Sequence, residues 1–124
     1  MEMTREELLK LIESKEVIGV NLSGQRLEKI DFTGCRIERT SFKGCELVHC
    51  RFRNAKISWS DFRYAEIQHG TFEGAEIEFS DFYRAFMDGV VIFSGSSFSN
   101  CSLNKTYLGE CAIIRKENLK NNKI

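Results

Sequence analysis

Three residues in one short stretch could together bind a metal ion or carry redox chemistry. Cys45, His49 and Cys50 lie within six residues of one another in the segment SFKGCELVHCRFRNA, which spans 41–55. Cysteine and histidine are common zinc ligands, and two nearby cysteines could also form a disulfide. A structural zinc site, however, needs four convergent ligands, and its cysteines are typically spaced C-x2-C. The chemistry of this stretch therefore depends on where the fold points each side chain.

The composition restricts the classes of function. The 124 residues suffice for one domain with a modest core, and 18 basic residues balance 18 acidic ones. A neutral chain has no general attraction to nucleic acid or to an anionic membrane. No apolar run approaches the ~20 residues of a membrane-spanning helix, and the charged N-terminal stretch lacks a signal-peptide core. We therefore expect a cytoplasmic protein that binds neither membrane nor nucleic acid directly, with five reduced cysteines.

Large apolar residues recur at every fifth position. Fourteen successive positions from Leu22 to Met87 follow this rule, and after a slip of one residue five more follow it from Phe93 to Ile113. The residue two places before each centre is small from Cys35 onward, and all five cysteines occupy this position. A period of five fits neither a helix nor a simple strand. It fits a coil of four short sides, about twenty residues in all, whose large and small residues both point inward.

The repeated unit resembles the A(D/N)Lxx repeat of the pentapeptide-repeat family, most closely in NAKIS, YAEIQ, GAEIE and SDF. The resemblance covers about residues 20–115. It implies an all-β fold, a right-handed quadrilateral β-helix of just under five coils. The chain then divides into an N-terminal capping helix with its lead-in (1–19), the β-helix (20–115) and a polar C-terminal tail (116–124).

This frame gives the cysteines and histidines a structural explanation. Cys45 and Cys50 occupy the small inward position, where a thiol acts as a small buried hydrophobe. His49 lies at a corner and should stack on His69, twenty residues later, at the surface. A narrow coil filled by phenylalanine rings leaves no interior pocket. We therefore expect no catalytic residues, no metal and no cofactor, and interpret the protein as non-enzymatic.

Residues twenty apart should lie ~4.8 Å from each other, which is the spacing between strands. This spacing predicts two phenylalanine ladders, one of Phe42, Phe62 and Phe82 and an opposite one of Phe32, Phe52 and Phe72. A slip at Asp88–Gly89 lets Phe93 continue the second ladder, and Asp-Gly tolerates the positive φ of a bulge. The alternative is a slip near Gly95, with Ile92 as the centre.

Among the outward-facing residues, a mainly basic coil lies directly beneath a mainly acidic one. Lys56 should lie beside Glu76, and Arg53 beside Glu73; such pairs help to set the register and contribute a few tenths of a kcal/mol each. A second interpretation is an acidic strip that binds a basic partner, formed by Glu66, Glu73, Glu76 and Glu78.

The two ends of the coil stack differ. Thr4 and Glu7 form a capping box that should start a helix of about 4–15, with Leu8, Leu9, Leu11 and Ile12 covering the first coil. No such cover is visible at the C-terminal end, near which Trp59 and several of the residues from Val90 to Phe93 should also project outward. The candidate self-association surface comprises Phe79, Phe86, Val91, Phe93 and Ile114. It predicts a homodimer through the C-terminal coils, unless the tail folds back as a cap.

Two functional hypotheses follow. The first is an interaction or scaffold protein whose outer coil faces bind another protein, as yet unidentified. The second comes from the resemblance, because some pentapeptide-repeat proteins, the quinolone-resistance (Qnr) group, bind DNA gyrase and topoisomerase IV and mimic duplex DNA. This chain departs from that pattern in its zero net charge, its shorter stack and its lack of a long projecting loop. The first hypothesis is therefore preferred.

Overall fold

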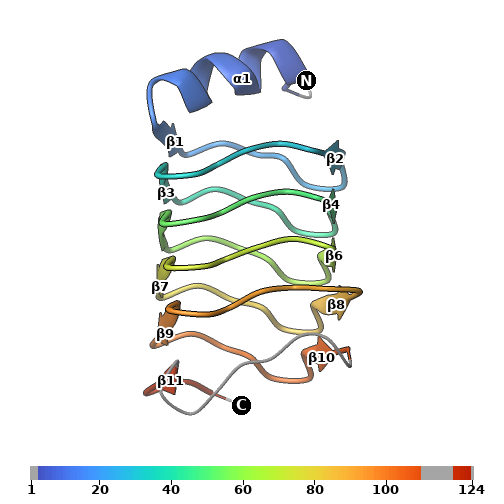
Figure 1. Ribbon diagram of the computed structural model, residues 1–124, viewed down its shortest axis with the longest axis vertical. Coiled ribbons are helices and arrows are strands. Elements are labelled where there is room, and N and C mark those ends of the chain that lie inside the picture. The colour runs from blue at the N-terminus through green and yellow to red at the C-terminus, as the bar shows by residue number, and fades with distance from the viewer. Residues whose placement is uncertain (1–2, 110–118, 124) are drawn as a thin grey trace.

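A computed structural model describes residues 3–109 and 119–123 as a quadrilateral β-helix with one N-terminal helix, which confirms the predicted fold class (Figure 1). Two opposite sides are parallel sheets. The odd sheet contains β1 (Glu16–Ile18), β3 (Arg36–Glu38), β5 (Lys56–Ser58), β7 (Glu76–Glu78), β9 (Ser97–Ser99) and β11 (Leu119–Lys120). The even sheet contains β2 (Arg26–Glu28), β4 (Glu46–Val48), β6 (Glu66–Gln68), β8 (Phe86–Asp88) and β10 (Tyr107–Leu108). Isolated parallel bridges join the coils on the other two sides, here called the Phe62 side and the Phe52 side.

Phenylalanine rings fill the interior. On the Phe62 side, the rings of Phe42 and Phe82 each stack on Phe62 with centroids 4.6 Å apart. On the Phe52 side, Phe52 stacks in the same way on Phe32 and on Phe72 at 4.7 Å. The two ladders meet edge to face across the narrow core, as Phe42 and Phe52 do at 5.8 Å. Both predicted ladders are therefore confirmed.

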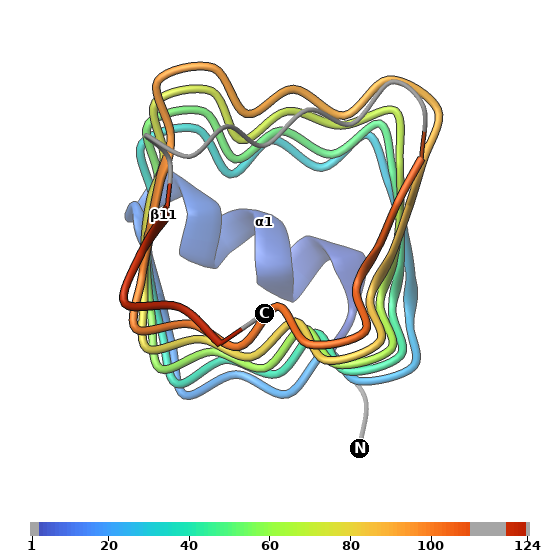
Figure 2. The ribbon, with the colours of Figure 1, turned by 90° about the horizontal axis from the view of Figure 1, so that it is seen from below.

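One extra residue enters the stack after β8. The register between coils is 20 residues up to the pair Gln68↔Asp88 and 21 residues from the bridge Thr71↔Ile92 onward. Phe93 consequently continues the second ladder, with its ring 5.3 Å from the ring above. This confirms the preferred placement of the slip. In Figure 2 the coil that follows the insertion (orange) lies outside the preceding coils along one side.

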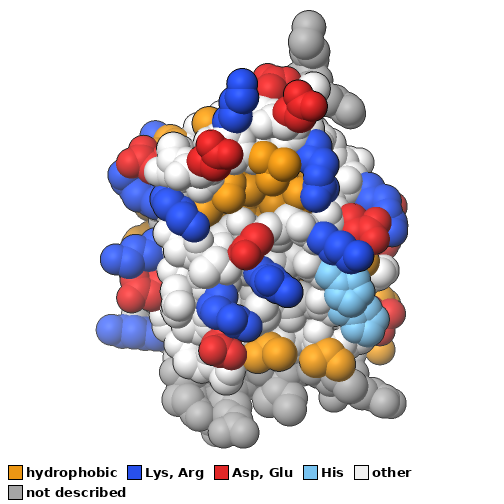
Figure 3. Space-filling model, turned by 45° about the horizontal axis from the view of Figure 1, so that its top comes forward, with side chains coloured by type: hydrophobic (Ala, Val, Ile, Leu, Met, Phe, Trp, Pro, Cys, Tyr) orange, Lys and Arg blue, Asp and Glu red, His pale blue; other side chains and the backbone are white. Residues whose placement is uncertain are grey.

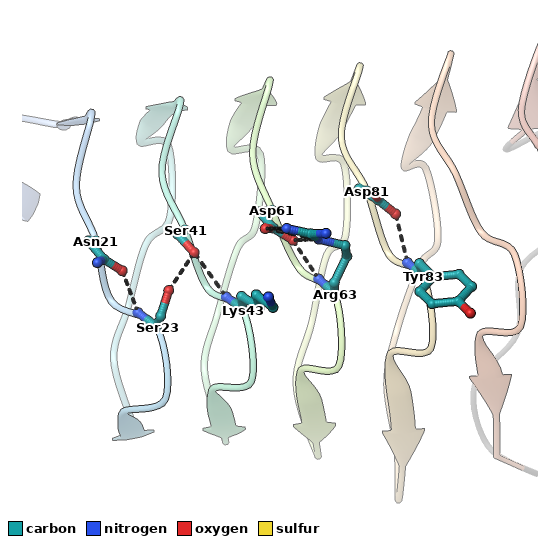
Figure 4. Close-up of polar contacts among 8 residues, drawn as sticks. All are labelled: Asn21, Ser23, Ser41, Lys43, Asp61, Arg63, Asp81 and Tyr83. Atoms are coloured by element: carbon teal, nitrogen blue, oxygen red, sulfur yellow. Dashed lines mark hydrogen bonds and ion pairs between the residues drawn. The ribbon is translucent and has the colours of Figure 1, made fainter.

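On the Phe62 side and the Phe52 side, a polar residue just before the inward centre usually caps the backbone two residues later. On the Phe62 side, side-chain oxygens of Asn21, Ser41, Asp61 and Asp81 accept hydrogen bonds of 2.9–3.3 Å from the N–H groups of Ser23, Lys43, Arg63 and Tyr83 (Figure 4). On the Phe52 side, Asp31 and Thr71 do the same. These short side-chain turns favour the bend that each corner needs. Among the described residues from Asn21 to Ser102, the residues at this position that do not form this bond are Arg51, Ile92 and Ser102.

Many corners use a left-handed backbone conformation. His49, Trp59 and Phe79 have φ values of 54°, 53° and 50°. This conformation costs an ordinary L-residue roughly 1–2 kcal/mol, so the hydrogen bonds between coils must hold it in place. The side chains at these three corners are exposed. Corners are therefore where the fold presents large side chains to solvent.

The N-terminal helix α1 (Arg5–Glu13) begins at the predicted capping box. Thr4 Oγ1 accepts from the Glu7 N–H, and Glu7 Oε1 accepts from the Thr4 N–H, both at 3.2 Å. The helix leads directly into β1, which already pairs with β3. The coils therefore begin at Glu16, a few residues before the expected boundary at residue 20.

Helix α1 lies across the open end of the first coil (Figures 1 and 2). Leu8 is fully buried, and Leu11 and Ile12 pack against the core. Leu9, however, is 39% exposed. The predicted apolar face is corrected at this residue, because one step along a helix turns the side chain about 100° away from Leu8.

The C-terminal residues that the structure describes continue the stack. Strand β11 pairs with β9, and Ser102 bridges to Lys123, so part of the expected tail (116–124) forms coil structure. Leu108, predicted to point inward, is 41% exposed, because no described strand follows β10 in the even sheet. Cys111 and Ile113 lie outside the described residues. Within the described part, the helix is too short and too polar to cross a membrane.

Candidate functional site

The clustered cysteines, Cys45 and Cys50, are core residues. The Cys45 thiol donates to the Leu22 carbonyl at 2.8 Å, and the Cys50 thiol donates to the Leu27 carbonyl at 3.3 Å. Burial raises the pKa of both thiols from the ordinary 9.0 to about 11. They are therefore protonated at neutral pH and are poor nucleophiles and poor metal ligands. In residues 3–109 and 119–123, no three His, Cys, Asp or Glu side chains are grouped so as to hold a metal ion.

The predicted self-association surface is only partly on the outside. Phe79 and Phe86 are each 42% exposed, as expected. Val91 and Phe93 are buried, with 1% and 2% of their surface exposed, so their assignment to this surface was wrong. The insertion makes Phe93 an inward centre, and Val91 takes the small position two residues before it. The fifth member, Ile114, lies outside the described residues.

Val90 and Ile92 project outward in place of these two residues, with exposed fractions of 51% and 40%. Several residues from Val90 to Phe93 were expected to face solvent, and two of them do, but they are not the two that were assigned to the surface. The insertion at Asp88–Gly89 already implied the correct assignment, because a residue beside an inward centre must point outward.

Two exposed aromatic pairs stand out on the coil surface. At the corner between the odd sheet and the Phe62 side, Trp59 is 63% exposed and stacks on Phe79 with ring centroids 4.6 Å apart. We call this pair the Trp59 corner. On the even sheet, Phe86 stacks on Tyr107 at 4.5 Å. Tyr107 was not part of the predicted surface, although the register of 21 residues after the insertion places it beside Phe86.

The predicted acidic strip does not form one surface. Glu66 lies in β6 of the even sheet, whereas Glu76 and Glu78 lie in β7 of the opposite, odd sheet. Glu73 lies between them on the Phe52 side. The prediction of a strip was therefore wrong, since residues ten apart point to opposite sides of a coil of about twenty residues. The four carboxylates surround one coil instead.

The odd sheet carries charges of both signs. Lys56 pairs in register with Glu76, as predicted, and both line a shallow depression of about 160 Å³ together with Arg36, Glu38 and Glu78. The salt bridges of the described residues are Arg26–Glu46, Arg26–Glu28, Arg36–Glu38 and Arg63–Asp61. Exposed pairs of this kind contribute little to stability and create no single-signed face for a basic partner.

A larger groove lies where the even sheet meets the Phe52 side. The rings of His49 and His69 stack there at 5.2 Å with an interplanar angle of 15°, which confirms the predicted pair. The groove has a volume of about 610 Å³, and its outward lining includes Lys29, Asp31, His49, Arg51, His69, Val90 and Ile92. We call it the histidine groove. Figure 3 shows the two histidines (pale blue) as one patch between basic and hydrophobic side chains.

His69 is fixed by the inserted segment. Its Nδ1 accepts a hydrogen bond of 3.3 Å from the Val90 N–H, so the neutral ring carries its proton on Nε2. A Cβ atom at Gly89 would collide with the His69 ring, so the absence of a side chain at Gly89 makes room for this histidine. Sequence reasoning identified the stacked pair, but not the groove, because the groove depends on where the insertion displaces the backbone.

Comparison with known proteins assigns the fold to a family. The sequence model of the pentapeptide repeat region matches residues 16–82, more than half of the chain. The chain belongs to the pentapeptide-repeat family. No curated protein matches this pentapeptide-repeat protein by sequence.

Several solved structures are similar to this chain at low sequence identity. The pentapeptide repeat protein Rfr23 from the cyanobacterium Cyanothece 51142 is 14% identical, with 95% of this chain and 97% of that chain covered and a TM-score of 0.41. A pentapeptide repeat protein from the thylakoid lumen of Arabidopsis thaliana is 21% identical, with coverage of 83% and 71% and a TM-score of 0.39. A trypsin-treated variant of QnrB1, a plasmid-mediated fluoroquinolone resistance protein, is 14% identical, with coverage of 86% and 90% and a TM-score of 0.40.

Proposed function

We propose that this pentapeptide-repeat protein is a non-enzymatic binding protein that recognises another protein through the outer surface of its coils. The observation that carries the proposal is the Trp59 corner, where two large aromatic rings are stacked and exposed at a rigid position. Tryptophan dominates many protein interfaces because it buries a large area at a small cost in side-chain entropy.

The closed interior supports the non-enzymatic part of the proposal. Phenylalanine rings occupy the axis of the coils, and the buried Cys45 and Cys50 thiols have pKa values of about 11. Any chemistry would therefore have to take place on the outer faces, which are shallow. Such faces suit the contact of one macromolecule with another better than the enclosure of a reacting group.

We also propose self-association through the C-terminal coils. Phe86 and Tyr107 stack on the even sheet, where β10 is the last described strand. Leu108 adds exposed apolar surface beside them. A second copy of the chain could cover these side chains together with the edge of β10 that no described strand pairs.

Gyrase or topoisomerase IV as the partner is not part of the proposal. A DNA mimic needs a continuous acidic face, whereas Glu66 and Glu76 lie on opposite sheets and basic residues lie between the acidic ones. The net charge of the chain is zero. The low similarity to QnrB1 indicates a shared fold alone.

The binding proposal is tested by affinity capture with three proteins: the natural chain, Trp59→Ser/Phe79→Ser, and the control Tyr64→Ser/Tyr83→Ser. The control removes a second aromatic pair from the next corner, of which Tyr64 is 49% exposed. A protein captured by the natural chain and the control, but not by the Trp59 corner variant, supports the proposal. Equal capture by all three would contradict it.

Self-association is measured separately by sedimentation. We expect a dimer that dissociates in Phe86→Lys/Tyr107→Lys, while the Trp59 corner variant remains dimeric. A clean monomer of the natural chain at high concentration would exclude the dimer and leave the binding proposal unaffected.

A further inference from the structure

We propose that the histidine groove binds a small organic anion, whose charged group is held by Lys29 and Arg51 and whose apolar part lies against Val90 and Ile92. This inference goes beyond the protein-binding function and does not depend on it. It rests on the charges that line the groove, on a local departure from the repeat pattern and on the shape that the insertion creates.

The two cations of the groove are available to a ligand. The side chains of Lys29 and Arg51 form no hydrogen bond or salt bridge with any described residue. Arg26, Arg36 and Arg63, by contrast, are each engaged by a carboxylate. The planar guanidinium of Arg51 can therefore present its donors to a phosphate or carboxylate group in the bidentate geometry that such anions prefer.

The acidic residue that lines the groove is held mainly by its own loop, and the charge of Arg51 in the next coil makes a smaller contribution to its lowered pKa. Asp31 Oδ1 accepts hydrogen bonds from both the hydroxyl and the backbone N–H of Thr33. The hydroxyl bond is the main cause that lowers the pKa of Asp31, so this carboxylate stays ionised and turned toward its own loop. Two cations, one engaged carboxylate and two histidines leave the groove with a net positive charge.

Arg51 interrupts the pattern that shapes the rest of the coils. At the same position of the Phe52 side, Asp31 and Thr71 cap the backbone two residues later, whereas Arg51 has no oxygen with which to do so. Ile92 also breaks the pattern, and it lies in the same groove. A natural sequence that gives up local stability at one place commonly does so for function.

The inserted residue gives the groove its apolar side. It moves the coil of Ile92 outward along the Phe52 side (Figure 2) and leaves Val90 and Ile92 half exposed at the rim. Gly70, in the coil above, also lines the groove. A volume of about 610 Å³ is in the range of small-molecule sites.

The test is a titration of isotope-labelled protein, followed by the NMR signals of the histidine rings and of the Arg51 side chain. The probes are benzoate, phenyl phosphate, inorganic phosphate and the uncharged benzyl alcohol at fixed ionic strength. We expect saturable shifts with benzoate or phenyl phosphate, weaker binding of inorganic phosphate and no binding of benzyl alcohol. The tighter of the two aromatic anions identifies the charged group as carboxylate or phosphate.

The decisive variants are Arg51→Thr and Arg53→Thr. A threonine in place of Arg51 would resemble Thr71 one coil below and could restore the local turn, so this variant should fold at least as stably as the natural chain. We expect Arg51→Thr to weaken anion binding about tenfold or more, the loss of one charge-assisted contact. Arg53 is exposed in the same coil but does not line the groove, so Arg53→Thr should bind as the natural chain does.

Three results would overturn the proposal. The first is no saturable shift with either aromatic anion. The second is equal weakening by Arg51→Thr and Arg53→Thr, which would indicate unspecific attraction to positive charge. The third is benzyl alcohol binding as tightly as benzoate, which would mean that the cations take no part.

Discussion

Replacement of Phe62 by alanine tests the inward and outward assignment of side chains in the coils. Phe62 has no exposed surface, and it lies in the middle of its ladder. Its ring is stacked on Phe42 and Phe82 at 4.6 Å and meets Phe52 and Phe72 edge to face at 6.1 and 6.5 Å. Alanine at this position would leave a space enclosed by four other rings.

The expected cost follows from this enclosure. Removing a buried phenylalanine ring typically destabilises a protein by about 3–5 kcal/mol, through lost transfer free energy and an unfilled cavity. The neighbouring rings are held by coils above and below, so the site can collapse very little, and we expect a value in the upper half of that range. Domains of this size have only about 5–15 kcal/mol of stability, so the loss should be large in any assay.

The measurement is a urea denaturation series with two controls. Phe79→Ala removes an aromatic ring that is 42% exposed and should cost about 1 kcal/mol, and Glu78→Ala should change stability by a few tenths of a kcal/mol. Similar losses for Phe62→Ala and Phe79→Ala would refute the assignment of inward and outward faces.

Further predictions concern the cap, the corners and the thiols. Thr4→Ala removes the side-chain hydrogen bond that begins the capping box and should cost about 1 kcal/mol in the same denaturation assay. Gly34→Ala and Gly74→Ala each place an alanine in a left-handed backbone conformation, which should cost roughly 1 kcal/mol of stability. Of these two, only the Gly74→Ala side chain would also collide with a neighbour, the side chain of Asn54, so Gly74→Ala should cost more. The Cys45 and Cys50 thiols should resist alkylation at pH 8 in the folded state and react on unfolding, as mass spectrometry can show. The pKa of both thiols is raised from 9.0 to about 11, so the folded state holds these protons more tightly than the unfolded state does. The stability that the protonated thiols contribute is therefore fully present below pH 9 and should be lost as the pH rises through 11.

The repeat made most of the fold predictable. Once each fifth residue was assigned to the interior, the ladder containing Phe62, the inward cysteines and the His49–His69 stack followed from arithmetic on residue numbers. These features depend only on a constant offset between coils, and that offset can be read from each five-residue repeat of the sequence. The capping box was equally local, because Thr4 and Glu7 are three residues apart.

The errors arose where the offset between coils changes, or at positions that the five-residue repeat does not constrain. Val91 was assigned to the outer surface together with other large apolar residues, without applying the one-residue shift that the insertion at Asp88–Gly89 imposes on every later position. The acidic residues were grouped by their nearness in the sequence, although Glu66 and Glu76 lie half a coil apart on opposite sheets. Leu9 was placed on the lid's apolar face by residue type alone, without regard to its angle on the helix.

The histidine groove illustrates how a repeat fold can acquire a specific site. A regular coil presents nearly flat faces, because each unit places the same backbone atoms one step further along the axis. Here one inserted residue pushes Ile92 outward, and Arg51 replaces a residue that would otherwise cap the backbone. Each departure alone would be a minor irregularity of the surface. Together they bring cationic and apolar groups from successive coils to one concave place, so a search for function in such a protein should start where the repeat is broken.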